Sequence, residues 1–144
     1  RGSVRRPTAT SHRPTSNMSP KIAIVYHSGY GHTERQARAV EEGARSFPGA
    51  SVSLIPVAQW EARRAELDAA DAFVLGCPTY LGSMSAPMKA FMDGTGGIWH
   101  SQLWKDKLAA GFTNSGSPSG DKFNTLVGFA TFAAQHGMVW VSLG

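Results

Sequence analysis

Residues 21–36 read Lys-Ile-Ala-Ile-Val-Tyr-His-Ser-Gly-Tyr-Gly-His-Thr-Glu-Arg-Gln, and this stretch decides the fold. Residues 22–26 form a short apolar run, which predicts a strand buried in a parallel sheet. The run ends at a loop with two glycines. A helical pattern then begins at Thr33, with Gln36 three residues later as in a capping box. Free N–H groups and the positive end of the helix dipole would meet in this loop, which favours a phosphate-binding site.

Two common nucleotide-binding patterns do not fit this loop. It lacks the lysine and the spacing of the nucleoside-triphosphatase loop. Gly29 and Gly31 match the start of a dinucleotide-binding pattern, but Glu34 stands where that pattern requires a small residue. The remaining donors are hydroxyl and N–H groups, which suit the phosphate of a monoester. An ordinary turn between a strand and a helix remains the alternative.

The first 17 residues differ in composition from the rest of the chain. They contain four of the 14 basic residues and none of the 10 acidic ones, so the remainder is neutral. A neutral body gives no reason to expect a nucleic acid or a polybasic membrane contact. We expect residues 1–17 to be a disordered leader or tag, with a transit peptide as the alternative. Residues 18–144 are expected to form one domain.

Cysteine content and hydropathy bear on the location of the protein. Cys77 is the only cysteine, so an intrachain disulfide is excluded, and a cytoplasmic location is expected. No apolar stretch has the length of a signal peptide or a membrane span. The five histidines are scattered without the spacing of metal ligands, so no metal site is expected.

Strand-like and helix-like segments alternate along the rest of the chain, which predicts an α/β fold with a parallel sheet. Further strands are expected at 51–57, 71–77, 108–113 and 138–143. Helices are expected from Thr33 onward and at 60–67, 85–92 and 124–135. A helix that would cover the sheet after its last strand is expected to be missing, with coverage of that face by something else as the alternative.

Three unusual loops each follow a predicted strand, at 27–33, 78–82 and 114–122. With the strands in the order 2-1-3-4-5, the carboxyl ends of the first and third strands are neighbours. Ligands bind at such a switch point of a parallel sheet. The three loops are therefore expected to converge on one binding site.

Five short motifs follow one another along the chain. They are Ser-Gly-Tyr-Gly-His-Thr at 28–33, Gly-Cys-Pro-Thr-Tyr-Leu-Gly-Ser-Met-Ser at 76–85, Phe-Met-Asp-Gly-Thr-Gly-Gly-Ile-Trp at 91–99, Lys-Leu-Ala at 107–109 and His-Gly-Met at 136–138. In this order and spacing, the chain from residue 21 to 144 resembles the WrbA-type NAD(P)H:quinone oxidoreductases, a flavodoxin-like family. The resemblance implies a three-layer sandwich around a five-stranded parallel sheet in the order 2-1-3-4-5. It also implies that residues 18–144 form an FMN-binding domain.

The resemblance implies roles for particular residues. His136 would lie near the flavin, and Trp99 would wall the pocket for quinone and nicotinamide, often across a subunit interface. These two are the implied catalytic residues. The implied cofactor-binding residues are Ser28, Gly29, Tyr30, Gly31, His32, Thr33, Pro78, Thr79, Tyr80, Leu81, Asn114, Ser115, Gly116, Ser117, Pro118, Ser119 and His136.

The chain also departs from the family pattern. Pro118 removes a backbone donor from a loop that is rich in glycine in the family. Cys77 stands where threonine is common, and residues 57–71 are too short for an insertion that aids tetramer formation. Without the family match, His136 is interpreted as a helix cap, Trp99 as a packing residue and Cys77 as a small core residue.

The activity implied by the resemblance is the FMN-dependent reduction of quinones by NAD(P)H. NAD(P)H and then a quinone would occupy the same place beside the flavin in a ping-pong transfer of two electrons as hydride. A homo-oligomer, either a dimer or a tetramer, is expected. One alternative is a flavodoxin-type electron carrier without its own substrate, against which the neutral charge and residues 96–99 as a pocket wall argue. The other is an interaction module that binds no flavin.

Overall fold

The computed structural model describes residues 19–142, so the leader expected at 1–17 lies outside the described residues. Its strands are β1 (Lys21–Tyr26), β2 (Ser51–Pro56), β3 (Ala72–Tyr80), β4 (Ser83–Met84), β5 (Leu108–Asn114) and β6 (Val139–Trp140). The sheet has the order β2-β1-β3-β5-β6, and each of these neighbouring pairs is parallel. The short β4 pairs antiparallel with β3 outside this series. The predicted order 2-1-3-4-5 is thus confirmed, with β5 and β6 as the fourth and fifth parallel strands.

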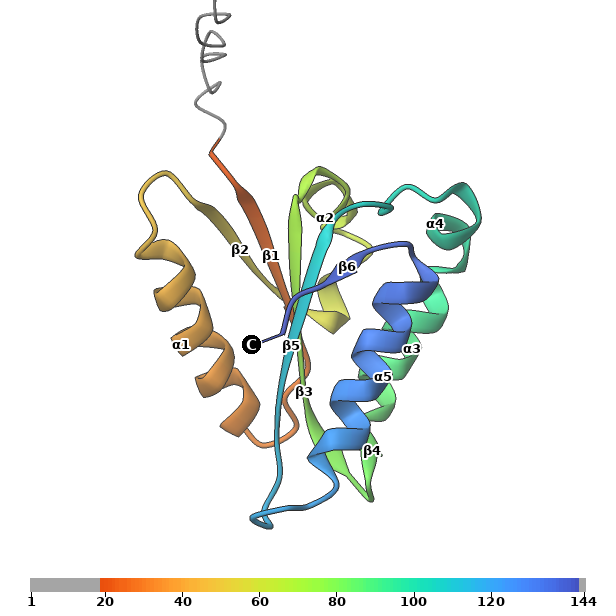
Figure 1. Cartoon of the computed structure of the whole chain (residues 1–144). Coiled ribbons are helices and arrows are strands. Elements are labelled where there is room, and N and C mark those ends of the chain that lie inside the picture. Colours follow the sequence, from red (N-terminus) through yellow and green to blue (C-terminus); the bar gives the residue numbers. More distant parts are fainter. Residues whose placement is uncertain (1–18, 143–144) are drawn as a thin grey trace, which may run out of the picture.

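The helices cover the two faces of this sheet and form a three-layer sandwich (Figure 1). One face carries α1 (His32–Arg45), and the other carries α3 (Ala86–Gly94) and α5 (Lys122–Gln135). The remaining helical segments are η1 (Val57–Gln59), α2 (Arg64–Ala69) and α4 (Gly96–Ser101). Within residues 19–142, none of the helices combines the length and the apolar content needed to cross a bilayer.

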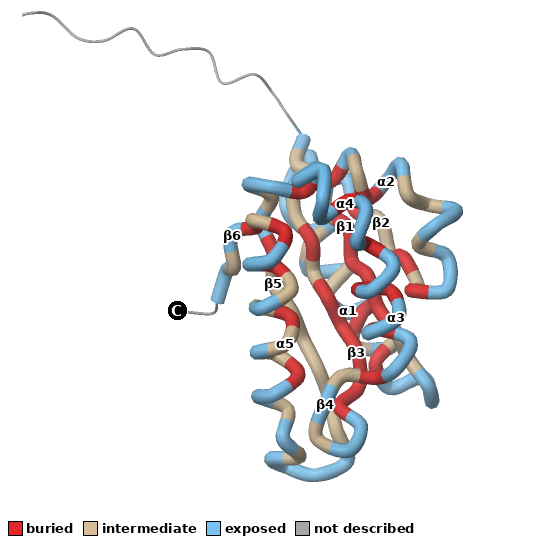
Figure 2. The backbone as a smooth tube through the Cα atoms, turned by 90° about the vertical axis from the view of Figure 1, so that its right-hand side faces the viewer, coloured by how far each residue is buried: buried red, intermediate tan, exposed pale blue. Residues whose placement is uncertain are grey.

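The larger core lies between the sheet and α3 and α5. It includes Phe73, Phe91, Trp104 and Phe129, all of which are buried. The smaller core under α1 contains Ile24, Tyr26, Ala37 and Val52. Figure 2 shows that the buried residues follow β3 through the middle of the domain. Side chains of β3 therefore alternate between the two cores, and this strand supports both layers.

The α1 face is open beside β5 and β6. Leu108, Val139 and Val141 are 46%, 53% and 47% exposed there. Leu108 is paired with Val139 in the parallel register, so both side chains lie on the same face. The two faces of the sheet therefore differ in how completely the described helices cover them.

The start of α1 differs from the expected capping box. The helix begins at His32, with Gly31 at the N-cap and no side-chain capping bond. Thr33 lies inside the first turn and is buried, and its hydroxyl is bonded to Asn114. The prediction was wrong because the pattern does not reveal a glycine with a φ of 87° before the helix.

Three further elements differ from the sequence prediction. β3 continues through residues 78–80, which were expected to be a loop, because Thr79 and Tyr80 pair with β4. The helix expected at 60–67 begins only at Arg64, after a 3₁₀ turn at 57–59. α4 was not predicted, because its sequence starts with two glycines, Gly96 and Gly97.

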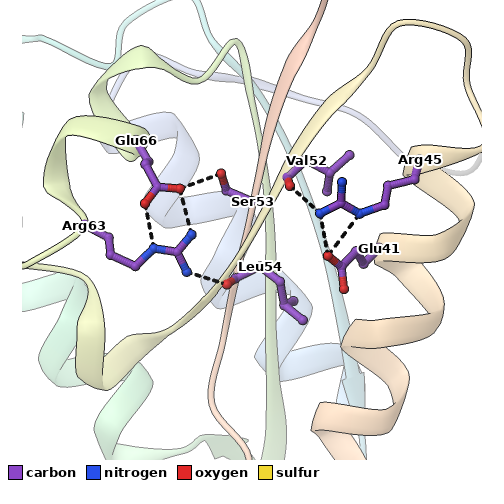
Figure 3. A network of polar contacts seen from close by, with 7 residues as sticks. All are labelled: Glu41, Arg45, Val52, Ser53, Leu54, Arg63 and Glu66. Atoms are coloured by element: carbon purple, nitrogen blue, oxygen red, sulfur yellow. Dashed lines mark hydrogen bonds and ion pairs between the residues drawn. The ribbon is translucent and has the colours of Figure 1, made fainter.

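Two arginines cover the free edge of the sheet at β2 (Figure 3). Arg45 Nη2 donates to the carbonyl oxygen of Val52 at 2.8 Å, and Arg63 Nη1 donates to that of Leu54 at 2.6 Å. Arg63 also pairs with Glu66, and together with Ser53 it lowers the pKa of the Glu66 carboxyl to about 2. An edge strand with occupied carbonyls is a poor template for another strand.

Candidate functional site

A cavity of about 720 Å³ opens where β1, β3 and β5 end, within the range of roughly 300–1,000 Å³ that is typical of ligand pockets. The three loops predicted to converge do meet here. The cavity is lined by Ser28, Gly29, Tyr30, His32, Thr33, Arg35, Gln36, Ala39, Pro78, Thr79, Tyr80, Asn114, Ser115 and Gly116.

The loop after β1, which we call the first loop (residues 27–31), leads directly into the unpaired N–H groups at the start of α1. Gly31 N–H donates to Ser28 Oγ at 3.0 Å, so the Ser28 hydroxyl keeps its own proton for another acceptor. Arg35 N–H is the first of α1 to reach a carbonyl, that of Gly31, at 3.0 Å. The N–H groups of residues 32–34 therefore have no carbonyl within the helix and point out of its N-terminus. This donor set fits a phosphate group.

His27 lies at the base of the first loop. Its backbone N–H donates to the carbonyl of Gly76 at 2.9 Å, which continues the pairing of β1 and β3 by one residue. Its Nδ1 is 2.8 Å from Ser85 Oγ, so the ring joins the end of β1 to the residue that precedes α3. Burial lowers the pKa of this imidazole. A neutral ring is therefore favoured at the base of the first loop.

Two tyrosines stand at the rim of the cavity. A Cβ atom at Gly29 would come within 2.5 Å of Tyr80 Oη, so glycine is needed for Tyr80 to lie against the first loop. The rings of Tyr30 and Tyr80 meet edge to face, with centroids 6.5 Å apart. Both side chains remain exposed, so they offer aromatic surface to a planar ligand.

The loop after β5, which we call the third loop (residues 115–120), is held by a lysine from the next helix. Lys122 Nζ donates to Ser115 Oγ at 3.0 Å, to the Ser117 carbonyl at 2.8 Å and to the Pro118 carbonyl at 2.9 Å. An ammonium group has three donors, and all three are used inside the loop. Ser117, Pro118 and Ser119, which were expected to bind the cofactor, are not among the residues that line the cavity.

Asn114 joins the third loop to α1. Its Nδ2 donates to Thr33 Oγ1 and to Gln36 Oε1, both at 3.0 Å. The hydroxyl of Thr33 is thus engaged with Asn114 instead of pointing freely into the first loop. These bonds fix the distance between the two loops across the cavity.

The hairpin of β3 and β4 is fixed to the start of α5. Asn124 Nδ2 donates to the carbonyl of Gly82 at 2.7 Å. The turn at the tip contains Leu81, which has a φ of 47° and a fully exposed side chain. Leu81 was expected to wrap the ring of the cofactor, but it is not among the residues that line the cavity.

A chain of three threonine hydroxyls supports the cavity floor at Thr79. Thr113 Oγ1 donates to the Cys77 carbonyl at 2.7 Å, so it must accept a proton from Thr79 Oγ1, 2.8 Å away. Thr125 Oγ1, 2.7 Å from Thr79, then donates to Thr79. Cys77 itself is buried, and burial raises the pKa of its thiol. This matches its interpretation as a small core residue.

Three residues of α1 line the cavity although the sequence analysis did not select them. They are Arg35, Gln36 and Ala39. Together with His32 they follow the spacing i, i+3, i+4 and i+7, which places them on one side of the helix. This spacing could have identified them from the sequence, because a helix that starts at the phosphate-binding loop must turn one side toward the ligand.

Trp99 and His136 lie elsewhere. They line a second cavity of about 570 Å³ between α3 and α5. α5 has 14 residues, about 20 Å in length, with the third loop before its start and His136 at its end. Within one chain, the structure therefore does not bring these two residues to the cavity formed by the loops.

His136 is almost completely enclosed, with 2% of its surface exposed. Its Nε2 is 3.0 Å from Thr95 Oγ1, whose own proton goes to the Met92 carbonyl at 2.7 Å, so Nε2 is the donor. Its Nδ1 has no partner among the described residues. Burial lowers the pKa of this imidazole, which favours the neutral ring.

A family model described as NADPH-dependent FMN reductase matches residues 20–142. Flavodoxin FldP of Pseudomonas aeruginosa (strain UCBPP-PA14) is 45% identical over 126 residues, which cover 86% of this chain and 66% of that protein. Quinone-oxidoreductase QR2 of Triphysaria versicolor is 34% identical over 145 residues, which cover 88% of this chain and 71% of that protein. The chain thus spans about two thirds of the length of these curated relatives.

Solved structures of flavodoxin-like proteins also resemble this chain. The flavodoxin, WrbA-like protein from Agrobacterium tumefaciens superposes with a TM-score of 0.79 and 48% sequence identity. The match covers 88% of this chain and 79% of that one. A flavodoxin from the domain Archaea matches with a TM-score of 0.67 and 26% identity, covering 85% of this chain and 78% of that one. The flavodoxin-like fold expected from the sequence is thereby confirmed.

Proposed function

Because the chain belongs to the NADPH-dependent FMN reductase family, we propose that it binds FMN in the cavity at the carboxyl ends of the strands and reduces quinones with NAD(P)H. The observation that carries the proposal is the junction of the first loop and α1, where the Ser28 hydroxyl and the unpaired N–H groups of residues 32–34 adjoin the cavity. QR2, a relative named as a quinone oxidoreductase, supports a quinone as the substrate. We also propose a cytoplasmic location.

The residues of the cavity fit the three parts of FMN. Residues 28–33 offer hydrogen-bond donors to the phosphate. Residues 78–80 and 114–116 line the remaining space with backbone groups and the Tyr80 ring, which suits a flat, amphipathic ring system. When bound, FMN would supply the two-electron chemistry between NAD(P)H and quinone, while the protein binds and orients it.

The task of this chain is to hold the binding site in shape before the cofactor arrives. The hydroxyl chain through Thr79 fixes the end of β3, and Asn114 fixes the third loop against α1. Tyr30 and Tyr80 offer surface that excludes water from one side of the bound ring. A preformed site avoids the entropic cost of ordering its loops upon binding.

We propose that Trp99 and His136 act on the flavin of a second copy of the chain. They lie in the cavity between α3 and α5, away from the loops of their own chain. In a homo-oligomer, dimer or tetramer, this surface would face the flavin of a neighbouring subunit and wall the space for nicotinamide and quinone. Trp99 is 46% exposed and would provide that aromatic wall.

A flavodoxin-type electron carrier is the second candidate, because flavodoxin FldP is 45% identical to this chain. A steady-state assay with NADPH or NADH and benzoquinone separates the two functions. We expect sustained quinone reduction and release of FMN, identified by mass, upon heating. Binding of FMN without oxidation of either nicotinamide cofactor would favour the carrier, and recovery of FAD would contradict FMN.

The role of Trp99 and His136 is tested in the two half-reactions. We expect Trp99→Ala to raise the KM for quinone and His136→Asn to slow one half-reaction in stopped-flow measurements, with FMN retained in both variants. Leu103→Ala, a change at another exposed apolar residue, should leave both half-reactions unchanged. Loss of FMN with unchanged half-reactions in the remaining holoprotein would assign both residues a structural role.

A further inference from the structure

Arg35 is a charged side chain of the cavity wall that the proposed function does not yet use. It lies on the exposed side of α1, one turn into the helix, and lines the cavity together with His32 and Gln36. The ion pairs found within residues 19–142 involve the cations Arg38, Arg45, Arg63, Arg64 and Lys89, so Arg35 belongs to none of them. Its guanidinium is thus available to a ligand.

The position of Arg35 in the helix directs its side chain toward the first loop. Side chains of an α-helix lean toward its N-terminus, so a long side chain lies over the preceding turn. For Arg35 the preceding turn is residues 31–34, where the N–H groups without helical partners lie. Arg35 thus lines the cavity beside His32 and Thr33, whose N–H groups have no partner within the helix.

The charges of the neighbouring residues make this part of the cavity positive. Glu34, in the same first turn, would repel an anion, but it is neutralised by Arg38, whose Nη2 and Nε lie 2.6 and 3.2 Å from Glu34 Oε1. Because Glu34 is paired with Arg38, its carboxylate does not neutralise the positive charge of Arg35. The donors of the first loop carry no formal charge, whereas a phosphate monoester carries about −1.5 to −2 at pH 7.

We propose that Arg35 binds the phosphate of FMN and supplies the positive charge that the first loop lacks; this rests on the proposed function that the cavity holds FMN. A guanidinium can donate two parallel hydrogen bonds to phosphate oxygens, which a hydroxyl cannot. The pair of Arg38 with Glu34 has the complementary task of keeping a carboxylate from opposing the phosphate. The phosphate site thus extends from the loop onto the helix.

The test compares FMN with riboflavin, which lacks the phosphate, in titrations of the apoprotein followed by flavin fluorescence. For Arg35→Gln we expect FMN affinity to fall about 10- to 100-fold and riboflavin affinity to stay unchanged. The FMN affinity of the unaltered protein should fall more steeply with added salt than that of Arg35→Gln. Arg35→Lys should recover part of the FMN affinity, because it restores the charge but not the planar fork.

Lys105→Gln serves as the matched control, because it removes the same charge from an exposed residue outside the cavity. It should leave both affinities unchanged. Equal weakening of FMN and riboflavin by Arg35→Gln, or no weakening of FMN, would overturn the role of Arg35 while the proposed function stands. Failure of the unaltered protein to bind either flavin would overturn both.

Discussion

The first and third loops both follow a strand at the same edge of the sheet and both lead into a helix of 14 residues, but they are held in different ways. The first loop is held by a bond within it, from Gly31 N–H to the hydroxyl oxygen of Ser28, and it turns into α1 at Gly31, which has a positive φ. The third loop is held by the ammonium group of Lys122, which reaches back from α5.

The difference separates two tasks within one binding site. In the first loop the Ser28 proton, and directly after it the N–H groups of residues 32–34 in the first turn of α1, remain free for a ligand. In the third loop the Lys122 donors and the carbonyls of residues 117 and 118 are already paired with one another. The first loop therefore contributes hydrogen bonds that raise the affinity for the ligand, whereas the third loop keeps its own conformation fixed. Each of the following predictions tests this distinction.

Ser28→Ala has the largest expected effect on FMN. It removes a donor to the phosphate, and a hydrogen bond to a charged group contributes roughly 1.5–3 kcal/mol, which corresponds to an affinity about 10- to 150-fold weaker. Ser117→Ala in the third loop is the control, because Lys122 is bonded to the carbonyl of Ser117 and not to its hydroxyl. Titration of both apoproteins with FMN measures the effect. An equal loss of FMN affinity in Ser28→Ala and Ser117→Ala would contradict the distinction between the loops.

Lys122→Met is expected to weaken FMN and riboflavin alike, by about 10-fold. The third loop would lose three hydrogen bonds and would have to be ordered on binding, at about 1–2 kcal/mol for each residue fixed. Limited proteolysis of the apoprotein should show new cleavage within residues 115–120, and Lys105→Met should show none. A loss confined to FMN would mean that Lys122 acts on the phosphate and not on the loop.

Two glycines, Gly31 just before α1 and Gly43 within it, should give smaller changes in the free energy of unfolding, with opposite signs. Gly31 has a φ of 87°, so Gly31→Ala should lower the free energy of unfolding by about 1–2 kcal/mol. Gly43 lies within the helix with open space around its Cβ position, so Gly43→Ala should raise it by about 0.5–1 kcal/mol. Urea denaturation of the apoproteins measures both. A change of the same sign in both variants would contradict the special backbone of the first loop.

The smallest effect is the pH dependence of the apoprotein. Burial lowers the pKa of His27 and His136 in the folded chain below the ordinary value of 6.5. Below pH 6.5 the unfolded chain therefore binds protons that the folded chain does not, so the free energy of unfolding should fall as the pH falls. His27 is the first residue of the first loop, whereas the third loop contains no histidine.

Urea denaturation at pH 8, 6 and 5 measures this dependence. His27→Gln should reduce the slope below pH 6.5, because it removes one of the two imidazoles whose pKa burial lowers. The carboxyl of Glu66, with its pKa of about 2 in the folded state and 4.5 ordinarily, adds a second loss only as the pH falls below about 4.5. A free energy of unfolding that rises on acidification from pH 6.5 to 5 would contradict the assignment.

Most of the fold could be predicted from the sequence because its signals are local. Apolar runs locate β1, β2 and β5, and the alternation with helices implies the parallel sheet. The end of β3 was missed because Pro78 ordinarily breaks a strand, yet here it stands where the strand leaves the sheet for a hairpin. α4 was missed because pairs of glycines usually indicate a loop.

The site could be predicted only where neighbouring residues determine it. The loop and the helix start at residues 27–33 are adjacent in sequence, so their donors could be inferred directly. The roles of Lys122 and Asn124 depend on how the third loop and the hairpin fold back, which no spacing reveals. Trp99 and His136 were selected through the family resemblance, because no local pattern places them at the binding site; the resemblance already put Trp99 at a subunit interface, and the structure separates both residues from the loops of their own chain.

The hairpin tip and the single cysteine also make this protein convenient for spectroscopy. Cys77 is buried, so it is shielded from thiol reagents while the domain is folded. Leu81, fully exposed at the tip of the hairpin, can be changed to cysteine without prior removal of a competing thiol. A fluorophore or spin label attached there would report whether the surroundings of the hairpin tip stay the same with and without the flavin, as expected for a hairpin fixed to α5 by Asn124.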